Sequence, residues 1–420
     1  MTRGHAVLAL LGFGLVVGCG GGTSATPDAG TEDAAATQDA TDPQAEAELR
    51  RIVAALADDA MGGRAPGTAG GAAARAFLAA EWTRCGIAPI GDTFEQPIGA
   101  SGGVNLVGRI AGADPTLRER HLVLSAHYDH IGECGGAICN GAYDNATAVA
   151  AVVQVACALA ASPPARSVLV AHWDAEEPPA FLTADMGSEY FAAHPLAPLA
   201  SLDAAIVLDL VGEDLWPGYL GHFVLGAETS AETAAAVAAT AVPAGLEVAH
   251  GGLHLVEETP FGHQPWSDYD AFRTRGVPVV FLSDGQNKRY HEPSDDVDGV
   301  DFPKLAREAA YLLALTRGLA NATATPVFVA GGADHASDAA TALAALTRAL
   351  GAGGIVAALG LGADTRAQLA ADLAAVTTIA GRLQAGGVAS AADLAALRRG
   401  VQRLMCLAGP LYDEAVCAML

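Results

Sequence analysis

The sequence predicts an α/β fold with three layers, in which a mostly parallel sheet has helices on both faces, followed by an all-α C-terminal extension. From residue 45 to 321, short apolar runs alternate with helical patterns. This alternation is typical of a parallel sheet that is buried on both sides. After residue 321 the Ala/Leu-rich segments show a helical pattern and no strand pattern.

The predicted strands are short and almost entirely apolar. They are residues 105–110, 121–127, 167–173, 204–211 and 277–282. The predicted helices between them are residues 46–56, 72–84, 146–161, 187–193, 230–241, 268–275 and 301–319. In the C-terminal extension, helices are expected over residues 337–350, 365–385 and 391–407.

The composition argues against two classes of protein. The 420 residues include 23 Lys+Arg and 47 Asp+Glu, which gives a net charge of −24. Nucleic acid as the main partner would need a basic face, which this balance does not favour. Hydrophobic residues make up 51%, but the longest uncharged apolar run, residues 6–18, is shorter than the roughly 20 residues that span a bilayer. A polytopic membrane protein is therefore not expected.

The N-terminus resembles an export signal. Arg3 precedes an apolar stretch that ends in Val16-Val17-Gly18-Cys19, which is similar to a bacterial lipobox. We expect residues 1–18 to be a signal peptide and Cys19 to carry the lipid, although an ordinary secretory signal is the alternative. Residues 19–44 contain almost no large apolar side chains, so we expect a disordered acidic tether.

The other six cysteines fit an oxidising compartment. An even number of cysteines in an exported chain suggests disulfides. Cys134 and Cys139 would close a Gly-rich loop, and Cys406 and Cys417 would fasten the C-terminus. For Cys85 and Cys157, buried free thiols are an equal alternative.

Oxygen and imidazole ligands follow the predicted strands. They are His127 and Asp129 at the end of strand 121–127, Asp144 beyond the next loop, Glu176 and Glu177 after strand 167–173, Asp209 near the end of strand 204–211, and His291 beyond strand 277–282. Sites in open α/β sheets form at the carboxyl ends of the strands. Two imidazoles and three carboxylates from such a set are enough to hold a pair of zinc ions, provided that one carboxylate bridges them.

Each of these residues also has an ordinary structural interpretation. Asp144 would suit the N-cap of a helix, and Glu176 and Glu177 could lie in a solvated loop. His127 alone could be a core histidine. The metal site is favoured because all the residues occur together and in order.

The motifs that contain these residues resemble a known family, the zinc-dependent aminopeptidases of the bacterial leucyl-aminopeptidase type. The wider family also holds glutamate carboxypeptidase II and glutaminyl cyclases. The motifs are AHYDH (126–130), GAYDNATAVA (141–150), DAEEPP (174–179), LDLVG (208–212), SDYDAF (267–272) and YHEPSDD (290–296), with DDAMGGRAPGT (58–68) and NLVG (105–108) upstream. The resemblance covers roughly residues 45–319.

The resemblance implies a role for each residue. His127, Asp144 and Asp209 would hold one Zn²⁺, with Asp144 bridging to a second Zn²⁺ that Glu177 and His291 complete. Glu176 would be the general base, and a water bridging the metals would be the nucleophile. Asp129 would orient His127. The family also implies a cis peptide bond between Asp144 and Asn145.

Three departures from the family pattern concern specificity. The loop between Glu177 and Gly187 is longer than is typical, and it should flank the pocket. Tyr269 and Tyr143 replace residues of other types. A glutaminyl-peptide cyclotransferase-like enzyme with one zinc is therefore kept as an alternative, although Asn145 after the bridging Asp favours the hydrolases. A non-catalytic surface binding protein on the same fold is a second alternative.

These predictions divide the chain into five parts. They are a lipoprotein signal peptide (1–18), the tether (19–44), a zinc metallopeptidase catalytic domain (45–321), a linker (322–335) and a helical extension of unknown role (336–420). We expect a lipid-anchored hydrolase of the bacterial cell envelope, periplasmic or surface-exposed. Its substrate would be a peptide or a small molecule with a free amino terminus.

Overall fold

A computed structural model of the chain describes residues 43–99 and 102–420. These residues belong to one compact unit. The predicted signal peptide, most of the predicted tether, and Cys19 lie outside the described residues, so the predictions about them stay predictions.

The core of the fold is a mixed sheet of nine strands with the order β1-β3-β7-β4-β8-β13-β9-β10, and β2 pairs with β3 outside this path. The strands are β1 (Ala88–Pro89), β2 (Glu95–Pro97), β3 (Val104–Ile110), β4 (His121–His127), β7 (Ser167–Trp173), β8 (Leu202–Leu208), β9 (Gly221–Leu225), β10 (Glu247–Gly251) and β13 (Val279–Ser283). The central strands β7, β4, β8 and β13 are parallel to their neighbours within this set. The antiparallel pairings involve β1, β2 and β3 on one side and β13 with β9 on the other.

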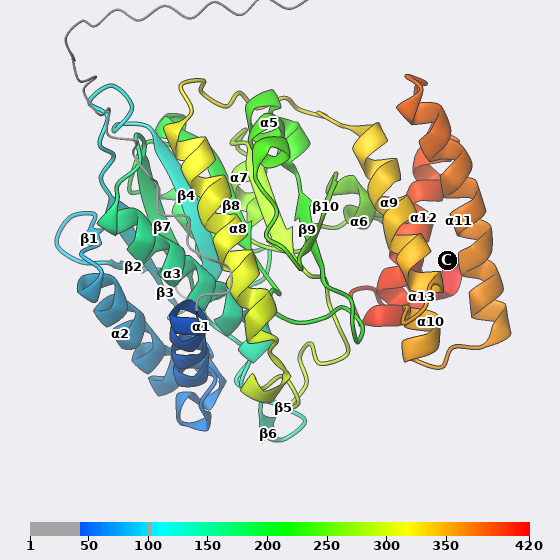
Figure 1. Ribbon diagram of the computed structural model, residues 1–420. Helices are drawn as coiled ribbons and strands as arrows, with labels where there is room; N and C mark the ends of the chain where they lie inside the picture. Colours follow the sequence, from blue (N-terminus) through cyan, green and yellow to red (C-terminus); the bar gives the residue numbers. More distant parts are fainter. Residues whose placement is uncertain (1–42, 100–101) are drawn as a thin grey trace, which may run out of the picture. The chain divides into compact units, whose positions relative to one another are not determined.

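The two faces of the sheet belong to two hydrophobic cores, because successive side chains of a strand point to opposite faces. Leu122 and Leu124 of β4 lie in the first core, whereas Val123 lies in the second. The helices that contribute to the first core are α1 (Pro43–Leu56), α2 (Ala69–Arg84), α3 (Thr147–Ala161), α5 (Ala231–Ala239) and α8 (Phe302–Asn321). Figure 1 shows α1, α3 and α8 lying across the sheet. The predicted three-layer α/β class is confirmed.

The second core joins the sheet to the C-terminal helices. Its helices are α4 (Gly187–Ala193), α6 (His254–Glu257), α7 (Tyr269–Arg273), α9 (His335–Leu350), α10 (Ile355–Ala358), α11 (Ala363–Gln384), α12 (Ala391–Ala408) and α13 (Glu414–Met419). In Figure 1, α9, α11 and α12 lie together beside β9, β10 and α6. The helical extension therefore continues the helical layer on this face of the sheet.

Local sequence signals explain where several helices begin. The side chain of Asp301 accepts a hydrogen bond from the backbone N–H of Lys304 at the start of α8. Ser390 and Asp393 form a capping box at the start of α12. Such caps satisfy backbone donors that the first turn of a helix leaves free.

Helix α3 is part of a segment, 142–161, that is apolar enough to cross a membrane, but 78% of its most apolar window is buried in the fold.

Three disulfides fasten the described chain. Cys134–Cys139 and Cys406–Cys417 pair as predicted, and Cys85 pairs with Cys157, with Cα–Cα distances of 5.8, 5.7 and 5.0 Å. The disulfide between Cys85 and Cys157 joins the end of α2 to α3. Cys134 and Cys139 lie in and beside a small hairpin, β5 (Glu133–Cys134) and β6 (Ala137–Ile138), and a second hairpin pairs β11 (Glu258–Thr259) with β12 (Gly262–His263).

Candidate metal centre

The predicted site residues meet at the carboxyl edge of the four parallel strands. His127 is the last residue of β4, which lies between β7 and β8 although both follow it in the sequence. Such a reversal of strand order opens a crevice at the carboxyl ends of the strands. Glu176 and Glu177 follow β7, and Asp209 follows β8 directly, so their positions beside His127 come from the strand order.

The first group of ligands surrounds Nε2 of His127. This atom lies 3.3 Å from Oδ1 of Asp209 and 3.3 Å from Oδ1 of Asp144. The Oε2 atom of Glu176 lies farther away, at 3.9 Å. All four side chains are buried. Glu176 thus lies beside the group, and with His127 and Asp209 it forms one of the clusters that could hold a metal ion.

The second group surrounds Nε2 of His291. This atom lies 3.0 Å from Oε2 of Glu177 and 3.3 Å from Oδ2 of Asp144. His130, to which the sequence analysis gave no role, joins this group: its Nδ1 lies 2.9 Å from Oε1 of Glu177 and 3.8 Å from Oδ2 of Asp144. The four side chains form one of the clusters that could hold a metal ion. His130 lies within the AHYDH motif, but only its contacts in the folded chain show that it belongs to the second ligand group.

Asp144 links the two groups, because its two carboxylate oxygens face different histidines. Its backbone position is fixed by Asp295, whose carboxylate accepts hydrogen bonds from the N–H groups of Tyr143 and Asp144 at 2.7 and 3.0 Å. The peptide bond between Asp144 and Asn145 is cis, as the resemblance implied. The alternative of a helix cap fails, because α3 begins at Thr147 and the side chain of Asp144 caps nothing.

The residues fit zinc in both geometry and chemistry. Two ligand atoms about 2.0–2.1 Å from a tetrahedral zinc ion lie about 3.3 Å apart, which matches the distances around His127 and His291. Oδ2 of Asp144 and Nε2 of His291 are buried and lie 3.3 Å apart, yet neither makes a hydrogen bond of acceptable geometry within the described ranges. Buried polar atoms are usually satisfied, so these two atoms call for a further partner.

The electrostatics of the site also favour a cation. Burial opposes protonation of His291, yet its contacts with Asp144 and Glu177 outweigh burial and raise its pKa to about 10. Burial would raise the pKa of Asp144, but His127 and His291 hold it well below its ordinary value. Both shifts mean that the neighbouring carboxylates stabilise positive charge at this position.

Glu176 is a buried carboxyl group whose surroundings disfavour its charged form. Burial raises its pKa well above the ordinary value, and the negative charges of Asp209 and Asp268 act in the same direction. Asp268 itself is fully buried, and burial raises its pKa to about 7. A raised pKa brings a carboxyl group closer to the pH at which an enzyme works. The SDYDAF motif marked Asp268, but its proximity to Glu176 appears only in the fold.

Asp129 supports both the imidazole and the turn that bears the glutamates. Its Oδ1 lies 3.6 Å from Nδ1 of His127. Its two oxygens also accept hydrogen bonds from the backbone N–H groups of Glu176 and Glu177, each at 3.2 Å. The predicted orienting role of Asp129 is compatible with these contacts, and such a partner holds a metal-binding histidine in position.

Left-handed backbone conformations occur beside three of the site residues. Ala175 precedes Glu176 with φ 57°, Leu210 follows Asp209 with φ 55°, and His291 itself has φ 58°. This region is uncommon for residues other than glycine. Strained residues of this kind cluster at functional sites.

Two residues hold the surrounding loops, and the sequence analysis gave neither of them this role. The buried guanidinium of Arg64 donates hydrogen bonds to the carbonyls of Tyr128 and Gly141 at 2.8 and 2.9 Å. The side chain of Asn145 donates to the carbonyl of Leu208 and accepts from the N–H of Leu210, which fixes the backbone around Asp209. Arg64 occurs in the DDAMGGRAPGT motif, whose function its spacing alone does not reveal.

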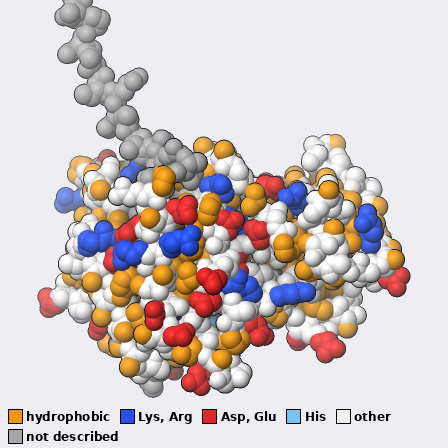
Figure 2. Space-filling view, turned by 60° about the horizontal axis from the view of Figure 1, so that its bottom comes forward, with side chains coloured by type: hydrophobic (Ala, Val, Ile, Leu, Met, Phe, Trp, Pro, Cys, Tyr) orange, Lys and Arg blue, Asp and Glu red, His pale blue; other side chains and the backbone are white. Residues whose placement is uncertain are grey.

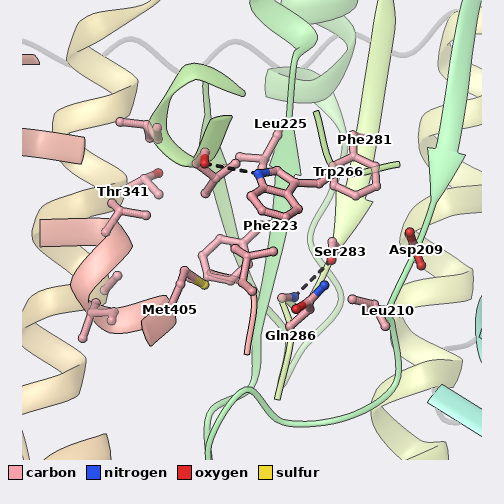
Figure 3. A pocket seen from close by; sticks show the side chains of 17 residues that line it. Asp209, Leu210, Phe223, Leu225, Trp266, Phe281, Ser283, Gln286, Thr341 and Met405 are labelled. Carbon is pink, nitrogen blue, oxygen red and sulfur yellow. Dashed lines mark hydrogen bonds between the residues drawn. The ribbon is translucent and has the colours of Figure 1, made fainter. Parts of the chain in front are cut away.

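Two cavities open beside the candidate metal centre. Asp209 contributes to an apolar pocket, shown in Figure 3. His130 and Glu177 contribute to a second, more polar cavity, which Pro178, Pro179 and the long loop up to Asp185 also line. The loop therefore flanks a cavity, as predicted.

Figure 2 shows the face of the molecule that lies at the bottom of Figure 1. Acidic side chains gather over the lower half of this view.

Both tyrosines that depart from the family pattern are buried and hydrogen-bonded. The hydroxyl of Tyr143 donates to the carbonyl of Gly285, which ties the loop of Asp144 to the loop after β13. The hydroxyl of Tyr269 donates to Oε1 of Glu257 at 2.8 Å and accepts from the N–H of Trp266. Tyr143 thus holds the loop of Asp144 and Tyr269 holds Trp266, and neither tyrosine belongs to the two ligand groups.

Comparison with known proteins agrees with this geometry. Residues 105–316, about half of the chain, match the sequence profile described as Peptidase family M28. A search of curated proteins finds no match.

Solved structures with the same fold include three from bacteria. A Zn-dependent exopeptidase from Parabacteroides distasonis has a TM-score of 0.50 and 21% identity, covering 64% of this chain and 96% of that chain. LapA of Legionella pneumophila has a TM-score of 0.52 and 15% identity, covering 66% and 73%. A glutaminyl cyclase from Porphyromonas gingivalis has a TM-score of 0.50 and 18% identity, covering 64% and 97%. At these identities the likeness establishes the fold.

Proposed function

The chain belongs to peptidase family M28 and is a metallopeptidase, and on that premise we propose that it is a zinc aminopeptidase with two metal ions per chain. It would hydrolyse the peptide bond that follows a free amino-terminal residue. The observation that supports two ions is the position of Asp144, whose oxygens lie 3.3 Å from Nε2 of His127 and 3.3 Å from Nε2 of His291. A carboxylate between two separate ligand groups is suited to bridge two ions.

The proposed reaction assigns each side chain one task. When bound, a zinc pair would polarise the scissile carbonyl and make the attacking water more acidic. Glu176 would take a proton from that water and pass it to the leaving amine. Asp129 would keep His127 and the backbone of Glu176 in position through its contacts with both.

A reporter assay tests this proposal against both alternatives. We expect the full chain to release the reporter from leucine amide substrates, to lose this activity with a zinc chelator, and to regain it with added zinc. The matched control is the same substrate with an acetylated amine, which should resist hydrolysis. Release of ammonia from a peptide that begins with Gln, without loss of the residue, would instead identify a cyclotransferase. No turnover and no bound metal would identify a binding protein.

We also propose that the protein is lipid-anchored in a bacterial cell envelope, in a periplasmic or surface-exposed position. The support within the described residues is the set of three disulfides, since such bonds persist in oxidising compartments. Replacing Cys19 by Ser should move the protein from the membrane fraction to the soluble fraction of the producing bacterium. A parent chain that is already soluble and unlipidated would contradict the anchor.

A further inference from the structure

A cluster of two histidines and one aspartate lies where the helical extension meets the rest of the fold. Oδ2 of Asp338 lies 2.8 Å from Nε2 of His254 and 3.0 Å from Nδ1 of His335. The three side chains form one of the clusters that could hold a metal ion. The proposed reaction uses none of them.

This cluster lies away from the candidate metal centre. Strand β13 is parallel to β8, whereas β9 is antiparallel to β13, and β10 is parallel to β9. The carboxyl ends of β9 and β10 therefore point away from the edge that carries His127. His254 follows the end of β10, and His335 and Asp338 lie in the first turn of α9. An ion held here would be separate from the two proposed catalytic ions.

Asp338 is held in the way that a metal ligand requires. Its side chain is buried, and its Oδ1 accepts a hydrogen bond from the backbone N–H of Gly252 at 2.7 Å. One oxygen is thus fixed by the backbone while the other faces both histidines, and such outer hydrogen bonds orient metal ligands. The N-terminus of α9 is capped by Asp334, so Asp338 does not serve as the cap.

A polar pocket adjoins the cluster. Its space is about 440 Å³, counting the space at its mouth, and Glu228, His250 and Asp338 are among the residues that line it. Nε2 of His250 is buried and has no hydrogen-bond partner among the described residues. A Cβ atom added to Gly252 would lie 2.6 Å from Cδ2 of His254 and 3.1 Å from Oε1 of Glu228. The missing side chain at Gly252 lets these groups approach one another, and the pocket gives an ion a route to Asp338.

The chemistry of the three ligands favours zinc over magnesium or calcium. Zn²⁺ takes His nitrogen and carboxylate oxygen, whereas Mg²⁺ and Ca²⁺ take oxygen ligands. The two contacts of Asp338 are a few tenths of an ångström shorter than the roughly 3.3 Å between two ligands of one zinc ion, so the side chains would separate slightly around it. The side chains of His254 and His335 are 19% and 32% exposed. The ion should therefore exchange with solvent and leave during exhaustive dialysis.

Arg398 competes with an ion for His254. Its Nε donates a hydrogen bond to Nδ1 of His254 at 3.3 Å, which places the proton of the neutral ring on Nε2. To bind an ion through Nε2, the ring must carry its proton on Nδ1, so the guanidinium must turn away. Arg398 is half-buried, and its long side chain can reach solvent. Removal of Arg398 should therefore favour the ion.

We propose that His254, His335 and Asp338 form a third zinc site, which fastens the helical extension to the catalytic part of the chain. His254 belongs to α6, whereas the other two ligands belong to α9, so one ion would join the two helices. The role is structural, and the site does not depend on the proposed aminopeptidase activity.

Zinc titration of the dialysed full chain tests this proposal. We expect the parent to bind one more Zn²⁺ than His335→Gln, or to bind it at least about tenfold more tightly, since even an outer partner of a ligand contributes about 10- to 100-fold in affinity. Added zinc should raise the Tm of the parent but not that of His335→Gln, because a ligand that binds only the folded chain stabilises it. Mg²⁺ should do neither. The matched control is His194→Gln, because His194 is exposed and belongs to none of the candidate metal clusters of the described chain.

Arg398→Gln provides a second variant with the opposite expectation. It should bind the additional zinc at least as tightly as the parent, because it removes the group that competes for His254. Equal zinc binding by parent and His335→Gln, or weaker binding by Arg398→Gln, overturns the third site. Unfolding without zinc shows whether each variant is folded, and His254→Gln replaces His335→Gln if the latter is not.

The outcomes also separate this inference from the proposed function. Hydrolysis of leucine reporters should be equal in the parent and in His335→Gln, because His335 lies outside the catalytic groups. A parent that hydrolyses no reporter but binds the additional zinc would contradict the aminopeptidase and support the third site. A parent that hydrolyses the reporters but binds no additional zinc would do the reverse.

Discussion

At the scale of the residue, the site depends on carboxylates whose roles are set by their neighbours. The sequence could predict that His127, Asp209 and the two glutamates meet, because each lies at or just after the end of a buried strand and parallel strands end at one edge. It could not predict that His130 and Asp268 join them. A histidine in a loop and an aspartate before a short helix have many possible environments, and only the folded chain selects one.

Glu176 is the residue whose replacement should affect chemistry and spare binding. Glu176→Gln keeps the size of the side chain but cannot take a proton, so turnover should fall by about 10²- to 10⁴-fold. Zinc content should stay at the parent value, since Glu176 lies 3.9 Å from His127 and outside the proposed ligands. Steady-state kinetics with metal analysis measures both. Glu133→Gln, at an exposed position, is the control, and near-normal turnover by Glu176→Gln would refute its role.

Glu213 makes stability depend on pH. Burial raises its pKa to about 7, against an ordinary value of about 4.3. Between these values the folded chain keeps a proton that the unfolded chain has lost. The free energy of unfolding therefore falls as pH rises through this window, by about 3–4 kcal/mol for this group.

Glu213→Gln should remove that contribution. Relative to the parent, the variant should gain stability as pH rises from about 4.5 to 7, the window set by the two pKa values. Above this window the difference in free energy of unfolding between variant and parent should stay constant. Urea unfolding at several pH values measures this. Glu119→Gln, whose side chain is 74% exposed, should show no such trend. A difference between Glu213→Gln and parent that does not change with pH would contradict the assignment.

At the scale of the element, apolar runs predicted the central sheet well and its edge poorly. Strands β4 and β7 have their predicted bounds because every residue in them is buried. Strand β8 ends at Leu208 rather than at Val211, because Leu210 adopts a left-handed conformation that a strand cannot include. Strands β9 and β10 were not predicted. They are five residues each, and β10 (EVAHG) is mostly half-buried, so its side chains show no apolar run.

The contact between Gly409 and Gln286 should be sensitive to a single methyl group. Gly409→Ala would place a Cβ atom 2.2 Å from the carbonyl oxygen of Gln286, so the two backbones must separate. We expect a loss of about 1–3 kcal/mol in the free energy of unfolding. Gly381→Ala is the matched control, because nothing lies within 4 Å of its added Cβ. Inside α11 it should stabilise by about 0.5–1 kcal/mol. Chemical denaturation compares them, and equal effects would contradict the close packing.

At the scale of the whole molecule, the C-terminal helices are part of the core that covers one face of the sheet. Leu346, Leu397 and Leu404 belong to the same hydrophobic cluster as Val123 and Phe281. The sequence could predict these helices from their Ala/Leu pattern. It could not predict what they pack against, because a buried leucine looks the same in a separate bundle and in a layer on a sheet.

The site belongs to the same scale, since its ligands come from four strands and the loops between them. The proposed site for two zinc ions depends on Asp144, which lies between the two groups of ligands. The most direct test is metal analysis of the full chain after exhaustive dialysis, for the parent and for Asp144→Ala. We predict close to two zinc ions in the parent, as expected for a bridged pair, and loss of zinc in the variant. A parent with one zinc ion or none, or a variant that keeps both, would contradict the claim.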